Sequence, residues 1–194
     1  MKTFLISVIF AFAPAALAHD HTTDLSILNR SKVGAATAEA LEMFETSGAG
    51  LLWTFQTESV NDEALSKIYF VTENTVKSAS YDCHFHAHGD EQQAHCHEGG
   101  ELNNVPSTAP ALSFNVDAYL EGLASSMDVF ERKISSLDNL TSIKMWQNTT
   151  EMFVTLSSSV NGVEAKAHFM CHIHAGTEID CHRSRNAGPG EPSF

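Results

Sequence analysis

The chain has 194 residues, of which 43% are hydrophobic, so it is long enough for one compact domain or two small ones with a real core. Asp and Glu number 24 against 11 Lys and Arg, and the formal net charge of −13 excludes a nucleic-acid-binding function, which needs a basic surface. The unusual feature of the composition is the presence of 11 His beside only 4 Cys.

Residues 1–18 have the pattern of a secretory signal peptide. Met1-Lys2 is a short basic start, residues 4–12 form an apolar run interrupted by Ser7, and Ala16-Leu17-Ala18 is a small-x-small cleavage site. The run is too short to span a membrane, and no later segment approaches the about 18 apolar residues that a span requires. We therefore expect an exported protein, periplasmic or secreted, with no membrane span.

Cleavage after Ala18 would leave His19-Asp20-His21 at the new amino terminus. The free amine, two deprotonated amides and the imidazole of His21 could enclose Cu²⁺ in a square plane, which is the geometry that this ion favours. His19 could alternatively chelate copper with its own amine. Both histidines are therefore candidate metal ligands.

A helix followed by three strand-like runs is predicted in each half of the chain. The first helix rests on a weak apolar stripe over residues 36–44 that ends before Gly48, and the second on a stronger stripe over residues 116–137 with Asn115 as its N-cap. The predicted strands are 51–57, 67–72 and 76–88 in the first half and 142–147, 152–157 and 163–175 in the second. Asn161-Gly162 is a typical two-residue hairpin turn, and residues 99–110 are predicted to form a linker.

The two halves share a motif that reads aromatic-x-Cys-His-apolar-His-Ala, at residues 81–87 and 169–175, and each copy is followed by a Cys-His pair, at 96–97 and 181–182. This pattern predicts a tandem duplication with a period of about 90 residues, which is too long for a solenoid repeat. The predicted fold class is α+β: a helix followed by an antiparallel β-meander, twice. The expected units are residues 19–104, with a His-rich hairpin at 82–98, and residues 105–194, with a His-rich hairpin at 168–183.

Export also bears on the four cysteines, because an oxidising compartment favours disulfides over a zinc site made of four thiolates. Three connectivities are possible, and we favour Cys83–Cys96 and Cys171–Cys181, because each pair can then lie directly opposed in an antiparallel hairpin. Strand alternation would place the Cys on one face and the neighbouring His on the other.

The first hairpin would turn at Gly89-Asp90 and oppose His84 to His95, Asp82 to His97 and His88 to Glu91. The second would turn at residues 175–177 and oppose His172 to Asp180, Met170 to His182 and His174 to Glu178.

The His-bearing faces are predicted to bind a transition metal, because imidazole and carboxylate ligands without free thiolate suit Zn²⁺ or Cu²⁺ and not Ca²⁺ or Mg²⁺. In the hairpins, the candidate ligands are His84, His86, His88, His95, His97, His172, His174, His182, Glu178 and Asp180. The leading hypothesis is a zinc-binding protein that captures or buffers the ion, or delivers it to a transporter or an apo-metalloprotein. One ion per hairpin and one ion shared between the hairpins are both open.

Three other functions remain open from the sequence. A copper chaperone or resistance protein would use the same ligands. A metalloenzyme would need three His with a neighbouring Glu such as Glu91, Glu98 or Glu178, but the chain has no H-E-x-x-H motif, and we expect no enzyme. A metal-independent interaction module could use the same histidines as a pH sensor.

Overall fold

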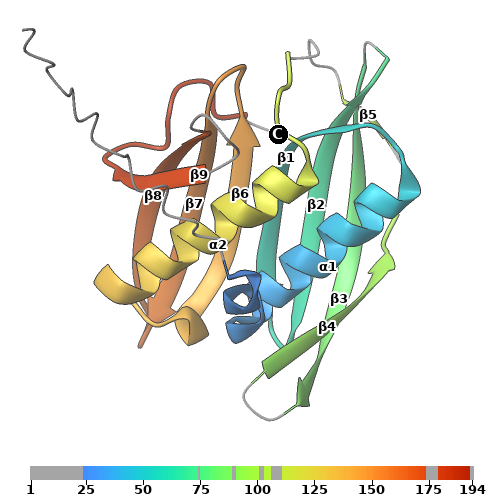
Figure 1. Cartoon of the computed structure of the whole chain (residues 1–194). Helices are drawn as coiled ribbons and strands as arrows, with labels where there is room; N and C mark the ends of the chain where they lie inside the picture. Colours follow the sequence, from blue (N-terminus) through green and yellow to red (C-terminus); the bar gives the residue numbers. More distant parts are fainter. Residues whose placement is uncertain are drawn as a thin grey trace, which may run out of the picture.

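In a computed structural model of the chain (Figure 1), the described residues are 24–73, 75–88, 91–100, 103–105, 111–173 and 179–192. The helical elements are η1 (Leu25–Arg30), α1 (Lys32–Ser47), α2 (Val116–Lys133) and η2 (Leu137–Asn139). The strands are β1 (Leu51–Val60), β2 (Glu63–Thr72), β3 (Thr75–His88), β4 (Glu91–Glu98), β5 (Asn103–Val105), β6 (Leu140–Gln147), β7 (Met152–Val160), β8 (Val163–Ile173) and β9 (Ile179–Ser184).

All of these strands belong to one antiparallel sheet, in the order β4-β3-β2-β1-β6-β7-β8-β9, with β5 paired to β3. The predicted fold class, a tandem duplication of a helix and a meander, is therefore wrong. Strand β1 pairs with β6, opposing Thr54 to Trp146 and Glu58 to Ser142, so that one sheet runs through both halves of the chain. The physical reason is that two separate meanders would each leave an open edge at β1 or β6, and pairing satisfies the backbone groups of both.

Both helices begin at the side-chain caps that their sequences offer. The Ser31 hydroxyl accepts a hydrogen bond from Gly34 N at the start of α1, and Asn115 Oδ1 accepts one from Ala118 N at the start of α2, as predicted. Helix α1 ends at Gly48, whose φ of 62° is the left-handed conformation typical of a glycine C-cap. Helix α2 ends at Lys133, earlier than the predicted 137.

The hairpin turn between β7 and β8 is the predicted one. Asn161 and Gly162 both have positive φ, 53° and 78°, which is the combination that a type I′ turn requires. The predicted linker at 99–110 is partly wrong, because Asn103–Val105 form a strand that pairs with residues 76–78 of β3. Residues 101–102 and 106–110 of that segment lie outside the described residues.

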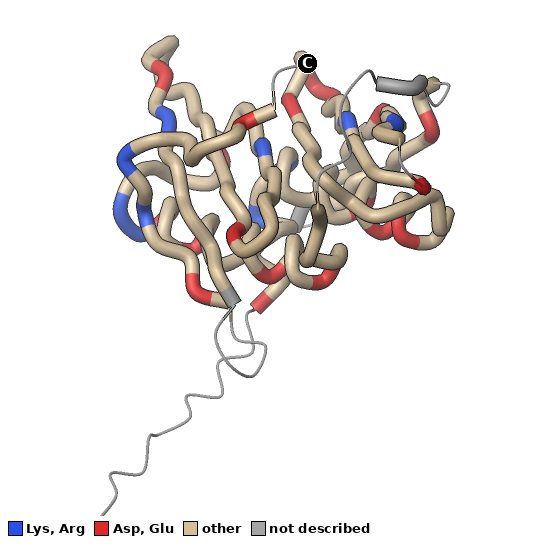
Figure 2. The backbone as a smooth tube through the Cα atoms, turned by 90° about the horizontal axis from the view of Figure 1, so that it is seen from above, with Lys and Arg blue, Asp and Glu red and all other residues tan. Residues whose placement is uncertain are grey.

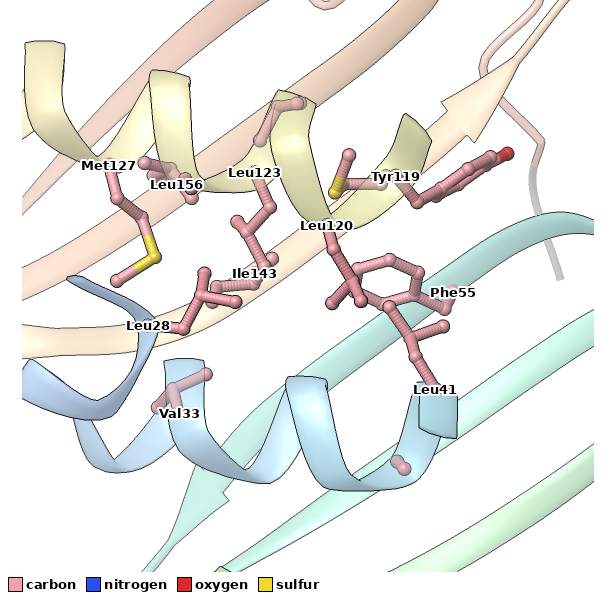
Figure 3. Packing of buried hydrophobic residues seen from close by; sticks show 14 of the residues in the cluster. Leu28, Val33, Leu41, Phe55, Tyr119, Leu120, Leu123, Met127, Ile143 and Leu156 are labelled. Atoms are coloured by element: carbon pink, nitrogen blue, oxygen red, sulfur yellow. The ribbon is translucent and has the colours of Figure 1, made fainter. Parts of the chain in front are cut away.

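The main core lies between the two helices and one face of the sheet (Figure 1). Figure 3 shows Leu41 of α1 and Leu120 of α2 close to Phe55 of β1, and Leu123 of α2 beside Ile143 of β6. The four side chains that α2, β1 and β6 contribute are buried: Leu120, Leu123, Phe55 and Ile143. The core also includes both cysteine pairs. The helices thus cover the cysteine-bearing face and leave the opposite face of the sheet, which we call the outer face, uncovered by any described helix.

The C-terminal segment covers part of the outer face. Lys144 of β6 donates hydrogen bonds to Glu191 Oε1 at 2.9 Å and to the carbonyl of Pro192 at 3.0 Å. A Cβ atom on Gly188 would lie only 2.3 Å from the ring of Phe153, so the segment packs directly on that ring, which stacks in turn on Trp146. Among the described residues, no helix is long and apolar enough to cross a membrane.

Candidate functional site

The hairpin of β3 and β4 has the predicted register. Cys83 opposes Cys96, His84 opposes His95, and the pairs Asp82–His97 and His88–Glu91 follow on either side. The disulfide Cys83–Cys96 is formed, with the two Cα atoms 4.0 Å apart. Both sulfur atoms face helix α1, since they lie 4.0 and 3.8 Å from the carbonyl oxygen of Ala36. Because side chains alternate along a strand, burial of the cysteines directs the intervening histidines to the outer face.

Three imidazoles gather on that face. The rings of His84 and His97 have centroids 5.0 Å apart, and those of His95 and His97 lie 4.8 Å apart, edge to face. The centroids of His84 and His95 are 6.1 Å apart. All three side chains are exposed to solvent. We call these three residues the histidine cluster.

The closest polar contact in the cluster joins His84 Nε2 to His97 Nε2, at 3.1 Å. Without a metal, one ring must donate its N–H and the other must accept it. In a tetrahedral zinc site with Zn–N bonds of about 2.0–2.1 Å, two ligand nitrogens lie about 3.3–3.4 Å apart. The two nitrogens are therefore already close to the spacing that a single shared ion requires.

The cluster is not a finished metal site. Within the described part of the chain, no group of three or more His, Cys, Asp or Glu side chains is arranged to hold a metal ion. The rings of His95 and His97 are nearly perpendicular, at 86°, and no polar contact joins His95 to the other two among the described hydrogen bonds. A third ligand from His95 would therefore require rotation of this exposed side chain between staggered rotamers. His86 is exposed on the same face, opposite Gln93, and the side chain of His88 lies outside the described residues.

The hairpin of β8 and β9 also has the predicted register, with Cys171 opposite Cys181, His172 opposite Asp180 and Met170 opposite His182. The disulfide Cys171–Cys181 is formed, and its sulfurs face the carbonyl oxygen of Gly122 in α2. The rings of His172 and His182 are 5.4 Å apart between centroids. His172 Nε2 lies 4.0 Å from Asp180 Oδ2, which is an ion pair only when the imidazole is protonated.

The two hairpins lie at opposite ends of the sheet, as Figure 1 shows. Five inter-strand steps separate β3 from β8, which corresponds to roughly 24 Å at about 4.8 Å a step. Ligands of one ion lie within about 4 Å of one another. One ion shared between the hairpins of a single chain is thus excluded by the sheet order.

His168, also on β8, is engaged in a different way from the candidate ligands. Its Nδ1 lies 2.9 Å from the Thr155 hydroxyl on the neighbouring strand β7. Burial and, to a lesser degree, the positive charge of Lys166 lower the pKa of His168, while Glu191 partly opposes them. A neutral, hydrogen-bonded imidazole in a half-buried position is consistent with a structural role.

Several predicted features fall outside the described residues. These are the signal peptide at 1–18, the turns at Gly89-Asp90 and 175–177, and four candidate ligands: His19, His21, His174 and Glu178. The predicted pair His174–Glu178 is therefore not described.

Two further surface features had no signal in the sequence. On the outer face, Lys67 and Tyr69 of β2 line a pocket with Lys144 of β6 and with Glu191 and Pro192 of the C-terminal segment. At the end of β9, Lys166, Arg183 and Arg185 line a hollow. The residues named for the pocket lie up to 125 positions apart in the sequence, and those named for the hollow come from two different strands. Only the folded sheet brings each group together.

Comparison with known proteins adds little to this geometry. No protein-family model matches the chain, and no curated protein matches it in sequence. A crystal structure of a proposed lipoprotein from Clostridium difficile 630 is similar over 77% of this chain and 93% of that one, with 7% sequence identity and a TM-score of 0.39. A similarity this low carries neither fold nor function across to this protein.

Proposed function

We propose that this chain is an exported protein that binds a divalent transition-metal ion, with zinc as its ligand, at the histidine cluster of the β3–β4 hairpin. The observation that carries the proposal is the 3.1 Å separation of His84 Nε2 and His97 Nε2, with the His95 ring beside them. Two exposed imidazoles at ligand spacing are held there by a hairpin whose register is fixed by a buried disulfide.

The donor set supports zinc or Cu²⁺ in preference to other ions. All four cysteines are in disulfides, so imidazole nitrogen is the donor that the cluster offers, and the oxygen-rich shell that Ca²⁺ and Mg²⁺ need is not offered by the cluster. Met145 is buried in the core, and Met170 lies at the other hairpin, so neither supports a Cu(I) site at the cluster. The 3.1 Å separation of the two nitrogens is close to the about 3.3–3.4 Å of a tetrahedral zinc site, so binding would need only a small opening of this pair and movement of further ligands toward the ion.

Exposure of the ligands supports a role in capture and transfer. A site on the surface of an edge hairpin is open to a partner that takes over the ion, and the acidic surface of the chain raises the local concentration of cations. Glu98 is one of the bases that a metalloenzyme could use. It directly follows His97 on β4, so strand alternation places it on the face of Cys96 and not on the face of the histidine cluster. This placement favours binding over catalysis.

Two disulfides support export, because such bonds persist in oxidising compartments and are rare in reducing ones. The signal-peptide pattern at residues 1–18 points the same way.

The test is zinc binding by isothermal titration and native mass spectrometry on disulfide-intact protein purified from the compartment to which it is exported. The double variant His84→Ala/His97→Ala should lose one zinc ion per chain, while the matched control His182→Ala at the other hairpin should keep it. Equal zinc uptake by the double variant and the unmodified chain would overturn the assignment. Cu²⁺ binds most nitrogen sites more tightly than Zn²⁺, so the metal is decided by what the protein holds as purified. Copper in place of zinc at the same two residues in that material would overturn the choice of metal and leave the site.

A further inference from the structure

The chain is strongly acidic, yet three exposed cationic residues line one hollow at the end of β9. Lys166 of β8 and Arg183 of β9 line a hollow of about 420 Å³ together with Arg185, which follows β9. The other described lining residues are Ala167, His168 and Ser184, so none of the described residues around the hollow is acidic. In Figure 2, several basic segments lie at the end of the molecule that carries β8 and β9, with acidic segments both among them and over the rest of the chain.

The hollow arises where the two edge strands stop pairing. The last paired residues are His168 and Ser184, but β8 extends back to Val163, so its first five residues have no partner on the β9 side. The chain leaves the sheet after Ser184 and carries Arg185 with it. Cationic residues therefore border the hollow on both β8 and the end of β9. Strand alternation places Lys166 on the outer face and Arg183 on the cysteine-bearing face, so the hollow lies at the edge of the sheet between the two faces.

The charges at the hollow are not neutralised by the described carboxylates. The ion pairs that Lys and Arg form with carboxylates in the described chain join Arg30 to Glu131, Lys32 to Asp62, Arg132 to Asp128 and Lys144 to Glu191. None of these involves Lys166, Arg183 or Arg185. The three side chains are exposed, so water and salt screen their mutual repulsion, and low ionic strength is the condition under which a bound anion gains most from them.

We infer that this hollow is a binding site for an oxyanion group such as phosphate or sulfate. Guanidinium groups pair bidentately with such oxyanions, a lysine adds a point charge, and Ser184, which also lines the hollow, carries a hydroxyl donor. The inference is independent of the metal site, which lies at the other end of the sheet.

The size and surroundings of the hollow favour a compact anionic group over an extended polyanion. A nucleic acid needs a basic surface that follows its backbone, and the net charge of −13 opposes such a partner beyond these three side chains. A free inorganic anion and the phosphate of a lipid headgroup both satisfy the same chemistry.

The test is titration of the disulfide-intact chain with inorganic phosphate and sulfate at low ionic strength, followed by amide NMR shifts, with a parallel arm on vesicles of anionic phospholipid. Saturable binding that weakens at least tenfold in Arg183→Gln/Arg185→Gln is the expected result. The control is Arg132→Gln/Lys133→Gln on helix α2, which removes the same charge elsewhere.

Saturation by either free anion that depends on Arg183 and Arg185 supports a small-anion site, and saturation by vesicles alone with the same dependence supports a headgroup site. Absence of saturation in both arms would overturn the inference. So would an equal loss of binding in the control variant, because the effect would then follow net charge and not this hollow.

Discussion

His84 lies closer to His97 than to His95, although His95 is its directly opposed partner across the hairpin. The ring centroids of His84 and His97 are 5.0 Å apart, against 6.1 Å for His84 and His95. The cause is the right-handed twist of paired strands, which brings one diagonal pair of long side chains within reach on each face. The diagonal pair is thus the part of the histidine cluster that is already in position for a ligand.

This diagonal contact gives a prediction for single substitutions. Loss of a residue that only supports a metal ligand typically weakens metal affinity by about 10–100-fold. We expect His84→Ala and His97→Ala each to weaken zinc binding by more than this, because each removes a ligand. The matched variant His86→Ala removes an exposed imidazole from the same strand and face, opposite Gln93, and should change the affinity less than threefold. Isothermal titration with zinc measures all three, and a larger loss in His86→Ala than in His97→Ala would contradict the diagonal pair.

The disulfide of the same hairpin should act on both stability and metal affinity. Cys83 and Cys96 enclose a separation of 13 residues, and removal of a cross-link of about this length costs about 3 kcal/mol in the chain-entropy account. We expect Cys83→Ala/Cys96→Ala to lower the free energy of unfolding by about this amount. The same variant should weaken zinc binding, because it removes the buried disulfide that fixes the register of the histidines.

The other disulfide is the control for that experiment. Cys171→Ala/Cys181→Ala removes a link with a separation of 10 residues at the far end of the sheet, so it should lower stability similarly and leave zinc binding at the histidine cluster unchanged. Urea denaturation with zinc titration on both variants decides the matter. Equal weakening of zinc binding by the two variants would show that global stability, and not local register, controls the affinity.

The hairpin registers could be predicted from sequence because two constraints act at one place. An alternation of apolar and polar residues defines the faces, and a cysteine pair of short separation fixes which residues oppose each other, since a slip by one residue would move every histidine to the cysteine face. The pairing of β1 with β6 had no such signal. Thr54 and Trp146 are 92 positions apart, and no local pattern in either strand specifies the other as its neighbour.

The end of α2 shows a similar limit of local patterns. The apolar spacing continues through Ile134 and Leu137, and both are at least partly buried, but Ile134 has left the helical conformation and Leu137 lies in η2. Apolar periodicity reports which residues reach the core and not where the backbone hydrogen bonds stop. The basic hollow was missed for a different reason: Arg183 and Arg185 are close in the sequence, but Lys166 lies on another strand, and only the pairing of β8 with β9 brings it to them.

The contact between η1 and α1 predicts a sensitive glycine. A Cβ atom on Gly34 would lie 2.4 Å from the carbonyl oxygen of Leu28, a backbone atom that cannot move without shifting η1. We expect Gly34→Ala to destabilise the protein by about 1–3 kcal/mol, in spite of the higher helix propensity of alanine. In the control Gly122→Ala, the new Cβ would lie 2.9 Å from the end of the flexible Met152 side chain, so the loss should be smaller. Thermal unfolding of both variants tests the difference, and an unchanged midpoint for Gly34→Ala would contradict the close packing.

The lowered pKa of His168 predicts a loss of stability in acid. Burial is the main cause of the shift, and Lys166 adds to it, so the folded protein binds a proton at this site less readily than the unfolded chain does. Stability from this group is therefore complete above the ordinary imidazole pKa of about 6.5 and is lost as the pH falls below that value. We expect His168→Gln, which can keep a hydrogen bond to Thr155, to show a shallower decline of the unfolding free energy between pH 7 and pH 5 than the unmodified chain. Chemical denaturation across that range measures the two slopes. A slope for the variant as steep as that of the unmodified chain would assign the acid sensitivity to other histidines.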